Sequence, residues 1–156
     1  MMITLRLLCV LATLSLCFVA RAQTAPCPWL TEGTAAELLS GPVAVATRIL
    51  PAGDSTCAFT RQQGAATSVL EISITASDHS ICPPNSMKLP GIGNEAVFCT
   101  PNHPPNEITD IVSGRARNLY FAVRLTITGK PSTTLSHAMR QSLLEQAAEE
   151  VAGNLY

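Results

Sequence analysis

The sequence predicts an α+β fold: an antiparallel sheet of about five to six strands, with an N-terminal short helix and a C-terminal amphipathic helix packed on it, and two disulfides. Three observations lead to this prediction. Segments with alternating apolar and polar side chains follow one another, separated by turn residues. Helix patterns lie before and after this run of strands, not between them. Four cysteines remain after an N-terminal leader is set aside.

The leader has the pattern of a secretory signal peptide. Arg6 precedes an apolar run over residues 7–20, and a small-x-small cleavage site ends at Ala22. The run is shorter than the ~20 residues of a membrane-spanning helix, which favours cleavage over retention as an anchor. We therefore expect a signal peptide at 1–22, a single secreted or periplasmic domain at 23–156, and no transmembrane segment after cleavage.

The mature domain would contain Cys27, Cys57, Cys82 and Cys99. An oxidising compartment favours disulfides, and four cysteines allow three pairings. We prefer Cys27–Cys57 with Cys82–Cys99, because each bridge then closes a moderate loop around one local element. A zinc site is the alternative, but no C-x-x-C pair occurs, and we expect no cofactor. The formal net charge is −1 and no basic run is present, so nucleic acid is not an expected partner.

The first helix is predicted within LTEGTAAELLSG, residues 30–41. Thr31 or Thr34 would cap it, Glu37 follows Thr34 at capping-box spacing, and Gly41 would end it. VAVATRIL, STCAFTRQQ and SVLEISITAS then show β-branched or alternating patterns with turn residues between them. We expect these segments to form a three-stranded meander over residues 43–50, 55–63 and 68–77.

The second half begins with a loop over residues 82–105, where six of the 11 prolines lie. We expect a bridged, ordered loop with one short strand at 96–100. Residues 107–129 then predict two strands joined by a hairpin turn at Arg117-Asn118, because Asn tolerates the left-handed backbone of such turns. From about residue 134 to 155, apolar residues recur on one helical face and predict an amphipathic helix on the sheet.

One motif within the loop matches a dinucleotide-binding spacing, Gly91-x-Gly93-x-x-Ala96. Such a site needs a strand before the first glycine and a helix after the last. Here prolines precede the motif and the β-like AVFC follows it. We expect instead that Gly91 and Gly93 supply backbone conformations closed to other residues.

A family resemblance covers most of the mature chain. The early Cys before LTEGTAAELLSG, the CAFT strand, GIGNEAVF, SGRARNLYFAVRLTITG and the final Ala-rich helix resemble small exported bacterial domains of unknown function common among actinobacterial lipoproteins. These domains are similar in turn to the PsbP/Mog1-like α+β sandwich. The resemblance implies helices packed on an antiparallel sheet and a Cys27–Cys57 disulfide, but no catalytic residues. The chain lacks the lipidation cysteine of many such proteins.

Two sets of residues are candidates for binding. The first set lies in the bridged loop, where a rigid segment loses little entropy on engaging a partner, and comprises Met87, Leu89, Ile92 and Phe98. Its alternative role is to seal a sheet edge. The second set is a basic patch for a carboxylate or phosphate, made by Arg115, Arg117 and Arg124 if the hairpin brings them together. Its alternative is a solvated sheet face.

These patterns favour a non-enzymatic binding or interaction module whose partner is a protein or a small ligand of the cell envelope. A small secreted hydrolase or metal-dependent enzyme using His79, His103 and Glu95 is one alternative, although no metal-ligand spacing or G-x-S-x-G elbow is present. Glu95 with Asp110 as an acid–base pair is a related hypothesis. A protease-inhibitor-like domain that uses the proline-rich loop is the other alternative.

Overall fold

A computed structural model describes residues 25–51, 54–78, 81–129 and 135–156, and the proposed signal peptide lies outside this part of the chain. Within it, the elements in chain order are α1 (Glu32–Leu38), β1 (Ala44–Arg48), β2 (Ser55–Gln63), β3 (Ala66–Thr75), β4 (Met87–Lys88), β5 (Glu95–Cys99), β6 (Glu107–Ala116), β7 (Leu119–Thr128) and α2 (His137–Asn154).

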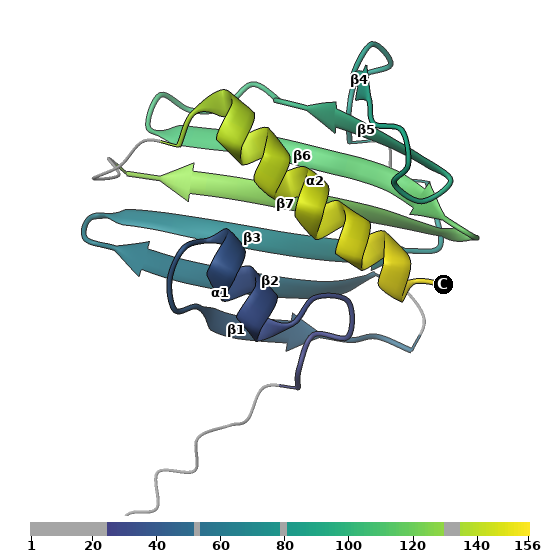
Figure 1. Ribbon diagram of the computed structural model, residues 1–156, viewed down its shortest axis with the longest axis horizontal. Helices are drawn as coiled ribbons and strands as arrows, with labels where there is room; N and C mark the ends of the chain where they lie inside the picture. The colour runs from purple at the N-terminus through teal and green to yellow at the C-terminus, as the bar shows by residue number, and fades with distance from the viewer. Residues whose placement is uncertain (1–24, 52–53, 79–80, 130–134) are drawn as a thin grey trace, which may run out of the picture.

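The described strands form one antiparallel sheet of seven strands in the order β1-β2-β3-β7-β6-β5-β4. The hairpins β2–β3 and β6–β7 meet through β3 and β7, which lie at the centre of the sheet (Figure 1). The chain therefore passes from β3 to the opposite edge of the sheet, beyond β7 and β6, where it forms β4 and β5. The two-residue β4 was missed by the sequence analysis, because a strand of that length has no measurable alternation.

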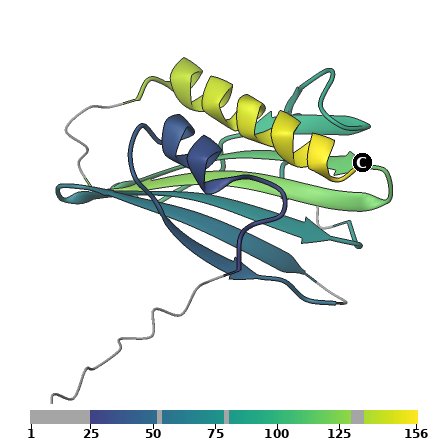
Figure 2. The same ribbon diagram turned by 60° about the horizontal axis from the view of Figure 1, so that its bottom comes forward.

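Both helices cover the same face of the sheet, α1 over β1 and β2 and the longer α2 diagonally over β6, β7 and β3 (Figures 1 and 2). The core lies between these two layers. Phe59, Leu70, Val123 and Leu144 are among its fully buried side chains. The expected α+β fold is confirmed, and no helix in the described ranges is long and apolar enough to cross a membrane.

Both helices lie within the ranges expected from the sequence, but the expected capping box of the first helix is absent. Thr31 is the N-cap, and its side chain accepts a hydrogen bond from the Thr34 amide at 3.0 Å. The Thr34–Glu37 capping box is not formed, because Thr34 already lies inside the helix and its hydroxyl faces Glu150 of α2. The second helix begins after Ser136, whose side chain accepts from the Met139 amide.

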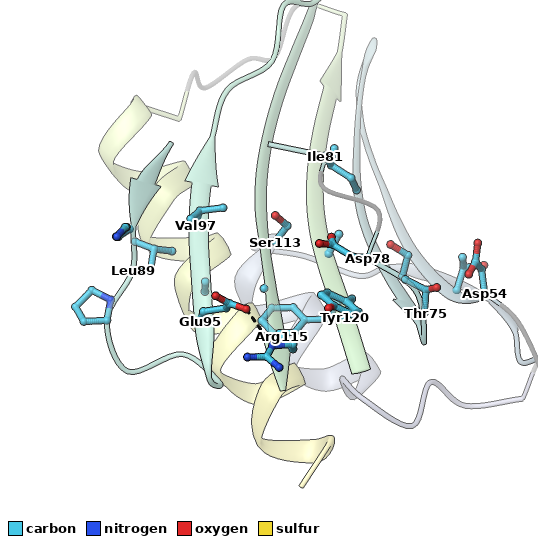
Figure 3. A pocket seen from close by; sticks show the side chains of 18 residues that line it. Asp54, Thr75, Asp78, Ile81, Leu89, Glu95, Val97, Ser113, Arg115 and Tyr120 are labelled. Carbon is cyan, nitrogen blue, oxygen red and sulfur yellow. Dashed lines mark hydrogen bonds and ion pairs between the residues drawn. The ribbon is translucent and has the colours of Figure 1, made fainter. Parts of the chain in front are cut away.

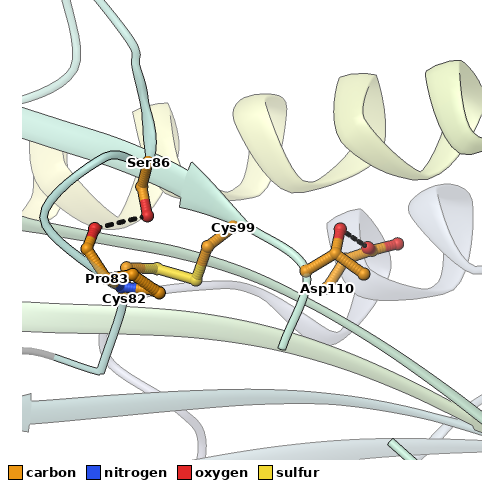
Figure 4. The surroundings of a disulfide bond; sticks show 6 residues. Cys82, Pro83, Ser86, Cys99 and Asp110 are labelled. Atoms are coloured by element: carbon orange, nitrogen blue, oxygen red, sulfur yellow. Dashed lines mark hydrogen bonds between the residues drawn. A yellow bond between two sulfur atoms is a disulfide. The ribbon is translucent and has the colours of Figure 1, made fainter. Parts of the chain in front are cut away.

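Both expected disulfides are present. Cys27–Cys57 joins the segment before α1 to β2, and Cys82–Cys99 joins the crossover after β3 to the end of β5. Figure 4 shows the second bridge and the turn that follows it, in which the Ser86 hydroxyl donates to the Pro83 carbonyl at 2.7 Å. The crossover is thereby attached to the sheet immediately before β4.

The glycine motif serves a turn into β5, as expected. Gly91 and Gly93 have φ of 88° and 60°, values that favour glycine. The motif leads into a strand and not a helix, so the arrangement that binds a dinucleotide pyrophosphate is not formed. The Arg117-Asn118 turn is also confirmed, but Arg117 and not Asn118 has the left-handed conformation, with φ of 55°. Its amide donates to the Asn94 side chain, which supports the turn.

Candidate functional site

The face of the sheet opposite the helices, which we call the open face, carries a large hollow. Side chains on this face alternate along each strand with those of the core. Parts of β2, β3, β7, β6 and β5 line a volume of about 1020 Å³, open to solvent on one side. We call this hollow the trough.

The floor of the trough is a row of small side chains aligned by the strand register. Each member pairs with the next across neighbouring strands, from β2 to β5. The row is Thr56, Ser73, Ala122, Ser113 and Val97. None of these side chains is long, and Ala122, in the middle of the row, is 7% exposed and packs against the Cys82–Cys99 bridge. The hollow is thus built into the register itself.

A second register row forms one wall. Thr75 on β3 pairs with Tyr120 on β7, Tyr120 with Arg115 on β6, and Arg115 with Glu95 on β5. Tyr120, Arg115 and Glu95 are longer than the side chains of the floor and rise beside it (Figure 3). Arg115 Nε donates to Glu95 Oε1 at 3.0 Å. This contact orients the guanidinium at the edge of the trough.

The crossover after β3 forms the opposite side. Asp78 and Ile81 lie on this segment and face the trough above the strands (Figure 3). The Cys82–Cys99 bridge packs with Ile111 and Ala122 in a small apolar cluster on the open face. The disulfide therefore joins the chain directly after Ile81 to the end of β5.

Charged groups are distributed unevenly along the trough. Asp54, before β2, lies at one end, Asp78, after β3, lies between it and the middle of the trough (Figure 3), and both are exposed. Lys88 on β4 lies at the other end, where it pairs with Val97. Within the described part of the chain these three side chains have no hydrogen-bond or ion-pair partner. One end of the trough is thus acidic, whereas the other carries an unpaired ammonium beside the Arg115–Glu95 pair.

The apolar residues expected to form a contact surface in the bridged loop lie mostly in the core. Leu89, Ile92 and Phe98 are buried, whereas Met87 is 44% exposed. Within this set, Ile92 and Phe98 therefore offer little area to a partner, whereas Met87 offers more. The buried side chains seal the β4–β5 edge of the sheet, which was the alternative role. Leu89 also contributes to one end of the trough.

The expected basic patch is not formed. Arg115 and Arg124 are on the open face, but they lie four register positions apart, roughly 13 Å along the hairpin. Each has its own carboxylate, Glu95 for Arg115 and Glu71 for Arg124, the latter at 3.7 Å. Arg117 lies in the turn and stacks over the Tyr156 ring, 5.1 Å from its centroid. Only Arg115 belongs to the trough.

The residues proposed for catalysis are also separated. His79 lies outside the described residues, and His103 is exposed with its Nδ1 3.0 Å from the Pro104 carbonyl oxygen. Glu95 is on the open face, whereas Asp110 is buried on the helix face against Arg140 of α2. The sheet therefore separates the two carboxylates of the hypothetical acid–base pair. Among the described residues no group of three metal-ligating side chains comes together.

Comparisons with known proteins add little to this geometry. No protein-family model matches the chain, and no curated protein matches it. One solved structure with some similarity is that of Ara h 8.0201, at 11% identity over 78% of this chain and 79% of that one, with a TM-score of 0.25. A likeness at this level carries no argument about fold or function.

Sequence reasoning missed the trough. Thr56, Ser73 and Ser113 are ordinary polar positions of strands, and nothing in their spacing relates them. The one signal present was small side chains on the polar parity of three separate strands. Its meaning depends on which strands are neighbours and in which register, and this is decided by long-range pairing.

Proposed function

We propose that the protein is an exported, non-enzymatic binding protein that holds its ligand in the trough. The observation that carries the proposal is the hollow of about 1020 Å³ on the open face. Its volume is that of a site for a small molecule, since ligand pockets are usually ~300–1,000 Å³. The short side chains of the floor row leave this volume open between the wall and the crossover.

Export is supported by the two disulfides, because such bonds form and persist in oxidising compartments. The relationship to small exported domains of the PsbP/Mog1-like type is likewise a proposal, supported by two helices on one face of an antiparallel sheet. Binding is favoured over catalysis because the best-placed carboxylate, Glu95, is engaged by Arg115. It is favoured over protease inhibition because the apolar side chains of the bridged loop are mainly buried in the core.

The proposal is tested by filling the trough. Ser113→Phe places a large ring on the floor of the trough. Thr126→Phe places the same ring on the open face as well, but on β7 and outside the trough. A library of small polar and amphipathic molecules is screened by amide chemical-shift changes on labelled exported protein. We expect bound molecules to shift the amides around the floor row and to lose at least about tenfold in affinity with Ser113→Phe only.

Two outcomes would overturn this function. In the first, no library member shifts amides of the trough. In the second, Ser113→Phe and Thr126→Phe bind the recovered molecules equally well while both variants keep their unfolding temperature. Either result would show that the hollow does not receive ligand.

A further inference from the structure

The charged side chains along the trough favour one orientation of a bound ligand. Asp54 lies at the β2–β3 end and Asp78 between that end and the middle (Figure 3), both without a cationic partner among the described residues. Lys88 lies at the β4 end, also unpaired there, and the Arg115 guanidinium is nearby. A ligand with a positive group at one end and a negative group at the other is complementary to this arrangement. A ligand of one sign would be attracted at one end and repelled at the other.

Arg115 keeps donors free for such a ligand. Its Nε is used by Glu95, but a guanidinium has five N–H groups, and the contact with Glu95 involves one of them. The Arg115 side chain is 42% exposed. Glu95 therefore positions the guanidinium through one N–H group, and the other four N–H groups can bind a carboxylate.

The floor favours a ligand with hydrogen-bonding groups along its whole length. The hydroxyls of Thr56, Ser73 and Ser113 are on the floor, and none of the three has a hydrogen-bond partner among the described residues. A hydroxyl both donates and accepts, so each can meet an N–H or a C=O group. An extended peptide offers these groups at every residue. A purely aliphatic body would leave the hydroxyls unsatisfied as it displaced water from them.

The length of the trough limits the size of the peptide. From β2 to β5 the floor crosses four strand spacings of ~4.8 Å each, or about 19 Å. An extended chain advances ~3.3–3.6 Å per residue, so about five or six residues cover this distance. The two termini of a peptide of that length would then reach the oppositely charged ends.

We infer that the trough binds a short free peptide, of about five or six residues, with its terminal ammonium toward Asp54 and Asp78 and its terminal carboxylate toward Lys88 and Arg115. This inference rests on the proposed binding function and goes beyond it by naming the ligand class and its orientation. The ligand lies across the strands. It does not extend the sheet, because the floor is a face of the sheet and not an edge.

The test uses penta-alanine in four forms: free, N-acetylated, C-amidated and blocked at both ends. Affinities are measured by calorimetry and by amide shifts on the exported protein at low ionic strength. We expect each block to weaken binding about three- to fivefold, because each removes one partly exposed charge contact. The doubly blocked peptide should be weakest.

Variants assign each terminus to its end. Asp54→Asn with Asp78→Asn should weaken the free peptide about three- to fivefold and leave the N-acetylated peptide unchanged. Lys88→Gln should weaken the free peptide similarly and leave the C-amidated peptide unchanged. Glu149→Gln, an exposed carboxylate on α2, is the control for loss of one negative charge and should affect neither peptide.

The failures of the two proposals are distinguishable. If library molecules bind in the trough and are lost with Ser113→Phe, but the four peptides bind equally or not at all, the peptide inference is overturned and the binding function stands. If no probe of any kind reaches the trough, both proposals are overturned. If Lys88→Gln weakens the C-amidated peptide but leaves the N-acetylated peptide unchanged, the proposed orientation is overturned.

Discussion

Arg140→Met is expected to lower the free energy of unfolding by about 3–5 kcal/mol. Asp110 is fully buried on β6, and Arg140 Nε donates to its Oδ2 at 2.6 Å. Thr100 donates to the other carboxylate oxygen at 2.6 Å, and Arg140 also donates to the Leu135 carbonyl at 2.8 Å. The contact attaches the first turns of α2 to the sheet. Methionine keeps the apolar stem and removes the charge, so the carboxylate stays buried without its cation.

The magnitude follows from the separation of the charges and their burial. Two unit charges about 4 Å apart interact by roughly 4 kcal/mol at an effective dielectric constant of about 20. Breaking a buried pair by removing one partner generally lowers stability by about 3–5 kcal/mol. The Arg140 side chain is 10% exposed and that of Asp110 0%, so solvent screens the pair little.

Arg124→Met is the matched control. Arg124 pairs with Glu71 at 3.7 Å, and the two side chains are 40% and 42% exposed. An exposed pair of this kind contributes about 0–1 kcal/mol. Urea unfolding of each variant with its disulfides intact, followed by far-UV circular dichroism, measures both changes. Equal losses for Arg140→Met and Arg124→Met, or a loss below about 1 kcal/mol for Arg140→Met, would refute the reasoning.

A second variant separates loss of the pair from loss of packing. Asp110→Asn with Arg140→Met removes both charges, while Asn can still accept the hydrogen bond from Thr100. Replacing a buried ion pair by neutral groups of similar volume is often nearly neutral in stability. We therefore expect the double variant to be more stable than Arg140→Met alone. If it is less stable by the sum of the two single effects, the uncompensated charge is not the cause.

Two further predictions concern covalent and backbone constraints. The paired variant Cys27→Ala/Cys57→Ala should lower the free energy of unfolding by about 3.6 kcal/mol, and Cys82→Ala/Cys99→Ala should lower it by about 3.1 kcal/mol. The first loss is larger because the first bridge closes a loop of 30 residues and the second a loop of 17. Chemical denaturation measures both losses, and a reversed order would contradict the loop-closure account. Gly93→Ala should lower the free energy of unfolding by at least about 2 kcal/mol, because the added Cβ would lie 2.6 Å from the Arg115 carbonyl oxygen. Gly64 has a similar φ but nothing within 4 Å of the added Cβ, so Gly64→Ala should lower the free energy of unfolding by only about 1 kcal/mol. Equal thermal shifts for the two glycine variants would remove the steric explanation.

The local structure of this protein can be recognised in its sequence. Alternation located β2, β3, β6 and β7, a hydroxyl cap located the first helix and apolar periodicity the second, and the spacing of four cysteines favoured the pairing that is formed. These signals are short-range: each depends on neighbouring residues and on backbone sterics, so it can be recognised without knowing the rest of the fold. The turn at Gly91 and Gly93 belongs to the same class.

Only the tertiary structure decided which side chains meet. Thr56, Ser73 and Ser113 form one floor because β3 pairs with β7 and because each strand has a particular register. A shift of one residue would move each of these side chains to the other face of the sheet. The same long-range pairing separates Arg115 from Arg124 and places Asp110 and Glu95 on opposite faces. The trough is therefore a property of strand order and register, which arise from burial of the whole core and not from any local stretch of sequence.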